Sequence, residues 1–325
     1  MRWSIDFPIP ASASPIPHSA KILSLGSCFA QTIGMKMRNA KFDILVNPFG
    51  TIFHPLSLVD LISQSLSGEP INPTGILERD GLYLHYSAHS DLREKSAEAL
   101  ASSFQAKVRE MQAYLQTGDF LILTLGTAWL YEHQELGRVA NCHKQPQKLF
   151  AKRLTELKEM QAEMEAVLEK IHEENPRLQV ILTVSPVRHI KDGVAENQLS
   201  KSLLRVLCGR LEAKFAQVSY FPAYEVMMDE LRDYRFYKPD LIHPSEEAED
   251  YIWKRWRETH FSPETQKSVT EIEKIGLELA HRPFNPDTEA HGKFLRKLLE
   301  KLERLNGQFD FSKEIEEVTL RLRSG

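Results

Sequence analysis

Residues 21–30, KILSLGSCFA, constrain the fold most, because they join an apolar strand to a helix through a tight turn. The apolar run within 22–25 predicts a buried strand, and a glycine follows it directly. From Phe29 onward the apolar residues recur at helical spacing. Two residues of the kinds that act as nucleophiles, Ser27 and Cys28, therefore lie on a strand–turn–helix junction.

A side chain on this junction lies at the carboxyl end of a strand and the amino end of a helix. Unpaired backbone N–H groups and the helix dipole favour negative charge at that place. We therefore expect the Cys28 thiol to have a lowered pKa, which His243 would lower further if it lies close by. The alternative is a structural turn in which Cys28 is an inert buried thiol.

Short apolar runs alternate with long helical patterns along the chain, which predicts a parallel sheet covered on both faces by helices. The predicted strands are 22–25, 42–46, 120–125, 178–184 and 218–221. The predicted helices are 29–39, 55–66, 95–116, 149–174, 196–215, 224–231 and 246–257, with hairpin arms at 81–86, 129–131 and 138–140.

Composition divides the chain into three parts. Residues 1–20 are rich in Pro, Ser and Ala and predict an extended arm. Residues 21–260 carry the strand patterns of the main domain, whereas 261–325 are charged and show helical periodicity alone. We expect this last part to be a helical appendage, with helices at 264–280, 288–305 and 313–323.

Charge and cysteine content argue against several classes of protein. The 325 residues have a net charge of −4 and a pI near 6.3, which argues against nucleic-acid binding. Cys28, Cys142 and Cys208 are too few and too scattered for a disulfide framework or a zinc site, and we expect no metal or cofactor. Without an apolar leader or a membrane-spanning run, we expect a cytoplasmic protein that does not bind membranes. No pattern favours a particular oligomeric state.

Polar, turn-forming clusters follow the predicted parallel strands, where open α/β sheets carry their sites. These clusters are Gly26-Ser27-Cys28, residues 47–50, Gly126-Thr127 and residues 185–189, and 240–245 form another before the last main-domain helix. Asp240 and His243 lie three residues apart on one turn, so the carboxylate can orient the imidazole as a base for a nucleophile. The alternative is a simple turn residue followed by a surface histidine.

The order of these motifs resembles the SGNH (GDSL-like) hydrolase superfamily and, more specifically, the GSCFA domain family, named for the run at 26–30. The further matching runs are NPFGTIFHP at 47–55, LTLGTAWLY at 123–131, NCHK at 141–144, SPVRHIKDG at 185–193, SKSLL at 200–204 and LRDYRFYKPDLIHPS at 231–245. The resemblance covers about residues 20–258. It implies a flavodoxin-like three-layer α/β/α sandwich with a central parallel sheet, and acyl-ester chemistry.

The resemblance also implies roles for single residues. It places the nucleophile two positions after the glycine, at Cys28, with Ser27 as the alternative. It makes His243 the general base and Asp240 the carboxylate that orients it. Backbone N–H groups of Cys28 and Gly50 match two donors of an oxyanion hole.

The third oxyanion donor of the superfamily is an Asn two residues after a glycine, and Ala128 replaces it here. Either Thr127 substitutes for it, or Asn141 arrives from the hairpin that follows. A polar turn is the alternative interpretation of Asn141 and its neighbour His143.

Four residues, Asn47, His143, Arg188 and His189, are candidates for substrate binding. Arg188 and His189 follow a buried strand, where they can hold a carboxylate, a phosphate or a sugar hydroxyl.

We therefore expect an acyl-ester hydrolase or acyltransferase that forms a covalent acyl-enzyme with an acylated carbohydrate or a similar small ester. The alternative is a catalytically silent module of the same fold that binds carbohydrate or another protein. The order of nucleophile, Asp and His favours the enzyme, and the missing Asn favours the binding module.

Overall fold

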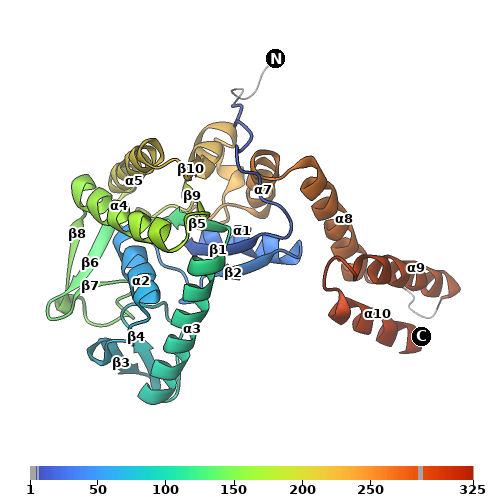
Figure 1. Ribbon diagram of the computed structural model, residues 1–325, viewed down its shortest axis with the longest axis horizontal. Coiled ribbons are helices and arrows are strands. Elements are labelled where there is room, and N and C mark those ends of the chain that lie inside the picture. Colours follow the sequence, from blue (N-terminus) through green and yellow to red (C-terminus); the bar gives the residue numbers. More distant parts are fainter. Residues whose placement is uncertain (1–4, 6, 285–287, 325) are drawn as a thin grey trace.

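The computed structural model describes residues 5, 7–284 and 288–324, and a five-stranded parallel sheet forms its centre (Figure 1). The strands are β1 (Lys21–Gly26), β2 (Asp43–Val46), β5 (Phe120–Leu125), β9 (Gln179–Val184) and β10 (Val218–Phe221), in the order β10-β9-β5-β1-β2. Counted along the chain this is the doubly wound 2-1-3-4-5 order, whose switch point lies between β1 and β5. The predicted parallel sheet is confirmed.

Helices cover both faces of the sheet, so the molecule has three layers, as predicted. One hydrophobic cluster joins the sheet to α2 (Pro55–Ser67), α3 (Ala97–Thr117), α4 (Leu157–Glu174) and α5 (Val194–Lys214). A second joins the other face to α1 (Cys28–Asn39), α6 (Ala223–Glu225), the π-helix η4 (Val226–Glu230) and α7 (Glu246–His260). Short 3-10 helices are η1 (Pro73–Gly75), η2 (Gln147–Leu149), η3 (Ile190–Asp192) and η5 (Tyr234–Phe236).

Two antiparallel excursions leave the main sheet. The first is the hairpin of β3 (Ile76–Arg79) and β4 (Leu82–His85). The second is a sheet of β6 (Trp129–His133), β7 (Gly137–Val139) and β8 (Phe150–Leu154), inserted between β5 and α4. The prediction of a helix from residue 149 is wrong at its start, because residues 150–154 pair with β6 and the helix begins only at Leu157.

The C-terminal part consists of α8 (Pro263–Ala280), α9 (Glu289–Leu305) and α10 (Ser312–Ser324), which confirms the expected helices. These helices share a small hydrophobic cluster of their own. Figure 1 shows α9 and α10 side by side, on the side of the molecule away from β6–β8. Lys41 pairs with Glu314 at 2.6 Å, and the His18 ring lies between Phe42 and Phe309, so this part is fastened to the main domain.

The N-terminal arm runs along the end of α7. Ser12 N donates to Thr259 O at 2.7 Å, and Ile16 N donates to His260 O at 2.7 Å. Residues 1–4 and 6 of the predicted arm lie outside the described residues. Of the helices that the structure describes, none combines the length and the apolar content that crossing a membrane requires.

Candidate active site

Ser27 and Cys28 take different places at the end of β1. Ser27 is fully buried, and its Oγ caps α1 by accepting a hydrogen bond from the Phe29 N–H at 3.2 Å. Cys28 is the first residue of α1 and is only half-buried, and the side chain of Thr51 hydrogen-bonds to its thiol. Cys28 is therefore the more accessible of the two.

Burial raises the pKa of the Cys28 thiol above its usual value. Hydrogen bonds from its own backbone N–H and from Thr51 act in the opposite direction but do not outweigh burial. The charge of Asp91 adds to the rise, and the charge of Lys238 opposes it. The predicted lowering of this pKa is wrong, because the turn is more deeply desolvated than the sequence indicates.

Asp240 and His243 form the expected pair on the loop before α7. Asp240 Oδ2 accepts a hydrogen bond from His243 Nδ1 at 2.7 Å, while Oδ1 accepts from the N–H groups of Ile242 and His243 at 2.9 and 3.0 Å. These bonds, above all the one from the His243 backbone N–H, lower the pKa of Asp240 to about 2. The side chains are 45% and 39% exposed, and His243 Nε2 bonds to none of the described residues. The ring is thus oriented with one nitrogen open.

Arg188 supports this loop, although the sequence favoured a role in substrate binding. Its backbone N–H donates to Ile242 O at 3.1 Å, and its guanidinium donates to Leu241 O at 3.3 Å. The guanidinium also stacks on the ring of Tyr237 at 4.0 Å. Leu241 has a left-handed backbone with a φ of 58°, so Arg188 holds a strained turn beside His243.

Two expected oxyanion donors have other partners. The Gly50 N–H donates to Asn47 O at 2.8 Å, and the Thr127 N–H donates to Phe53 O at 3.2 Å. Asn47 is itself buried and accepts from the Gly26 N–H at 2.9 Å, so it shapes the turn. The donor roles of Gly50 and Thr127 and the substrate-binding role of Asn47 do not fit these contacts.

The Thr127 side chain is also engaged: its Oγ1 accepts from the Trp129 N–H at 3.1 Å and lies 3.2 Å from Ser200 Oγ. By contrast, the N–H groups of Cys28 and Thr51 have no carbonyl acceptor among the described residues. The role of the Cys28 N–H as an oxyanion donor stays a prediction. Thr51 is a second candidate that sequence reasoning missed, although it lies within the quoted run at 47–55.

His143 is 1% exposed, and both of its ring nitrogens have partners inside the protein. Nε2 lies 2.8 Å from His85 O, and Nδ1 lies 3.0 Å from Ser90 Oγ. Asn141 Oδ1 accepts from the His143 N–H at 2.8 Å, as in an Asx turn. The polar-turn interpretation fits His143, whereas Asn141 also lines a cavity.

His189 lies in the loop that follows β9, and Lys201, on α5, reaches the carboxyl ends of β5 and β9 with its ammonium group. Burial lowers the pKa of His189 to about 3, with the charges of Lys201 and His243 contributing, and its buried Nε2 has no partner among the described residues. Lys201 is wholly buried, and its Nζ donates to Gly126 O and Ser185 O, each at 2.7 Å. Burial lowers the pKa of Lys201 to about 7. Sequence reasoning missed Lys201, because a lysine in an amphipathic helix is typical of a surface.

A second Asp–His pair lies beside the nucleophile turn, and sequence reasoning missed it. His89 Nδ1 lies 3.0 Å from Asp91 Oδ2, and the His89 N–H donates to Phe49 O at 2.8 Å. A Cβ on Gly50 would come within 2.4 Å of the His89 Cβ, and Gly50 has a φ of 75°, so this position requires glycine. The only signal in the sequence was the short spacing of His89 and Asp91 in a polar loop.

A cavity of about 860 Å³ lies between the carboxyl ends of β5 and β9 and the β6–β8 sheet. Cys28 and His243 do not line it, but Phe53, Thr127, Asn141 and His189 do. It therefore adjoins the nucleophile turn rather than enclosing it.

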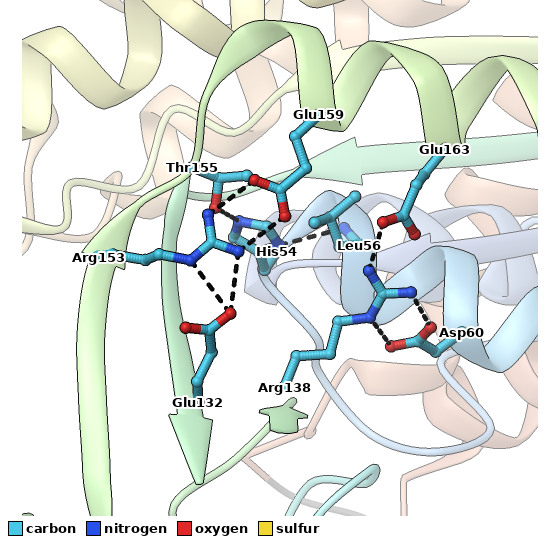
Figure 2. A network of polar contacts seen from close by, with 9 residues as sticks. All are labelled: His54, Leu56, Asp60, Glu132, Arg138, Arg153, Thr155, Glu159 and Glu163. Carbon is cyan, nitrogen blue, oxygen red and sulfur yellow. Dashed lines mark hydrogen bonds and ion pairs between the residues drawn. The ribbon is translucent and has the colours of Figure 1, made fainter. Parts of the chain in front are cut away.

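A network of charged residues fastens the β6–β8 sheet, and thus one wall of the cavity, to α2 and α4 (Figure 2). Arg138 on β7 bonds both oxygens of Asp60 on α2, at 2.7 and 2.6 Å, and Glu163 on α4 at 2.7 Å. Arg153 on β8 joins Glu132 to Glu159 in the same way. Bidentate pairs of this kind add geometric specificity, so the network sets the position of this wall against α2 and α4.

Among the described residues, no three His, Cys, Asp or Glu side chains are grouped as ligands for a metal ion.

The fold and the strand-end residues define a doubly wound α/β protein with an Asp–His pair and an accessible cysteine at the carboxyl edge of its sheet. Comparison with family models gives two matches: the GSCFA family over residues 21–256, and the C-terminal domain of GSCFA domain proteins over residues 272–324. The chain belongs to the GSCFA family. Searches of curated proteins and of solved structures returned no match.

Proposed function

We propose that this protein is an SGNH-like acyl-ester hydrolase or acyltransferase with Cys28 as its nucleophile. The observation that carries the proposal is the Asp240–His243 pair, in which the carboxylate holds Nδ1 at 2.7 Å and leaves Nε2 open. Such a pair is the base and orienting group of the serine and cysteine acyl-transfer enzymes. Lys238, on the same loop, acts electrostatically on Cys28, which supports proximity of the two parts.

In the proposed reaction, Cys28 Sγ attacks the ester carbonyl carbon while the thiol proton passes to His243 Nε2. The N–H groups of Cys28 and Thr51 stabilise the oxyanion. The C–O bond then breaks, and His243 returns the proton to the leaving alcohol, which leaves a thioester. Water or an acceptor hydroxyl attacks this thioester through the same base, and the proton returns to Cys28.

The raised pKa of the Cys28 thiol decides how the nucleophile forms. A thiol with a raised pKa is protonated near neutral pH, so it has to lose its proton during attack. General-base catalysis by His243 is thus required, and a resting thiolate–imidazolium pair is not part of the proposal.

Three free cysteines also fit a reducing compartment such as the cytoplasm.

The experiment is acyl labelling of the purified protein by an activated ester, p-nitrophenyl acetate, read by peptide mass spectrometry. We expect one acetyl group on the peptide that contains Cys28. Cys28→Ala should abolish this label. The matched variant Ser27→Ala should keep it, while losing about 1 kcal/mol of stability because the cap of α1 is gone.

Two results would contradict the proposal. A label that survives Cys28→Ala and vanishes in Ser27→Ala would restore a serine mechanism. No label in the folded wild-type protein would favour a silent binding module, the alternative that the internally bonded N–H groups of Gly50 and Thr127 already support.

A further inference from the structure

The cavity beside the sheet edge carries more positive than negative charge. Lys144, Lys152 and Lys191 line it together with a single carboxylate, Asp192. Asp192 is already paired with Lys152. Lys144 and Lys191 are both exposed, and within the described chain neither has an ion pair, so each ammonium group is free to pair with an anion at the cavity.

Aromatic side chains form an apolar surface in the same cavity. Trp129, Tyr131, Phe53 and Phe150 line it. The Lys152 ammonium lies 5.2 Å from the Trp129 ring centre and 5.3 Å from that of Tyr131. Flat rings next to positive charges fit a ligand that has both a ring face and an anionic group.

The cavity begins close to the nucleophile turn. Thr51 contacts the Cys28 thiol, and Phe53, two residues later, lines the cavity. Between them the Ile52 N–H donates to Gly26 O at 2.9 Å, which holds this segment against the end of β1. A ligand in the cavity thus lies next to the residues that contact Cys28.

His189 is the second link between the cavity and the sheet edge. It lines the cavity, and its buried Nε2 is without a partner among the described residues. The charge of His243 acts on His189, so the two imidazoles lie near one another. Because this nitrogen has almost no exposed surface and faces the Gly126 backbone, where an added Cβ would come within 3.3 Å of it, His189 shapes the wall that the cavity shares with the sheet edge.

We propose that this cavity binds the alcohol portion of the substrate and that this portion is a ring compound bearing a carboxylate or a phosphate. Its ring packs on Trp129 and Tyr131, and its anionic group is held by Lys144 and Lys191. That the ligand is part of a substrate rests on the proposed function. That the cavity binds such a ligand can be tested independently of any reaction.

The test is equilibrium binding to the Cys28→Ala protein, read by quenching of tryptophan fluorescence and checked by calorimetry. The probes are 4-hydroxybenzoate, phenyl phosphate and the neutral isostere 4-hydroxybenzamide. We expect at least one of the two anionic probes to bind about tenfold more tightly than the amide. This difference in affinity should become smaller as the salt concentration rises. Whichever of the two anions binds more tightly identifies carboxylate or phosphate as the group recognised.

The double variant Lys144→Gln/Lys191→Gln should remove the preference for the anions and leave the amide unaffected. Lys148→Gln is the matched control, because it removes an exposed lysine of the same segment that does not line the cavity. The inference is overturned by equal affinity for anions and amide in the parent protein, by a preference that persists in the double variant, or by no saturable binding of any probe.

Turnover of phenyl acetate by the wild-type protein separates this inference from the proposed function. Loss of anion binding with intact turnover contradicts only the cavity assignment. Anion binding without any turnover contradicts only the acyl-transfer proposal.

Discussion

Two Asp–His pairs lie on the loops around the Cys28 turn, and they are held in different ways. In the Asp240–His243 pair the carboxylate bonds His243 Nδ1 at 2.7 Å and accepts two backbone N–H groups as well. In the His89–Asp91 pair the carboxylate lies 3.0 Å from His89 Nδ1, and the Asp91 N–H approaches the same nitrogen at 3.4 Å.

The difference lies in which tautomer each pair fixes. One ring nitrogen cannot donate to a carboxylate and accept from an N–H at the same time. Asp240 therefore fixes a proton on Nδ1 of His243 and leaves Nε2 as the acceptor. For His89, the carboxylate favours the tautomer with a proton on Nδ1, whereas the Asp91 N–H favours the tautomer without one. A base needs one fixed tautomer, so the comparison favours His243.

The largest expected effect separates the two histidines directly. His243→Ala should slow acylation of Cys28 by about 10²- to 10⁴-fold, because the thiol loses the group that takes its proton. His89→Ala should slow it by less than about tenfold. Stopped-flow release of p-nitrophenol measures both, and thermal melting checks that each variant is folded. Losses of equal size would make the two pairs equivalent and contradict the assignment.

The two carboxylates should differ as well, by a smaller margin. Asp240→Asn should cost on the order of 10²-fold in acylation rate, because the amide neither fixes the Nδ1 proton nor stabilises the imidazolium. With a pKa of about 2, the wild-type Asp240 stays ionised from mildly acidic to alkaline pH. The acid limb of a pH–rate profile should therefore not come from Asp240, and it should survive in Asp240→Asn.

Asp91→Asn serves as the matched control for Asp240→Asn and should leave the acylation rate within a few-fold of wild type. A larger loss in Asp91→Asn than in Asp240→Asn would reverse the comparison.

The sequence predicted the parts of the molecule that depend on local patterns. The strand and helix periodicities of the main sheet and of the C-terminal helices are local, and so is the three-residue spacing of Asp240 and His243. Strand β8 was missed because residues 150–154 become a strand only by pairing with β6, which is distant along the chain.

The rest of the site depends on contacts that no local pattern shows. The N–H groups of Gly50 and Thr127 are taken by the carbonyls of Asn47 and Phe53, so their availability could be judged only in the folded chain. Lys201 is wholly buried although its helix has a polar face, because it bridges two strand ends. The depth of burial of Cys28, which sets its pKa, is likewise a tertiary property.

The smallest expected effect concerns the charges that act on the Cys28 thiol from the two loops. Asp91 raises the pKa of this thiol and Lys238 lowers it. Asp91→Asn should therefore lower the pKa, and Lys238→Gln should raise it. Because the thiol pKa lies above neutral pH, the thiolate fraction near neutral pH should rise in Asp91→Asn and fall in Lys238→Gln. Thiolate nucleophilicity changes in the opposite sense with a Brønsted slope of about 0.4–0.5, so the net change in alkylation rate is about half as large on a logarithmic scale.

Iodoacetamide alkylation of Cys28 against pH, with Glu289→Gln on the C-terminal helices as the control charge, measures both the pKa and the rate. Shifts of the same sign in the two variants would show that the loops act on Cys28 through structure rather than through charge.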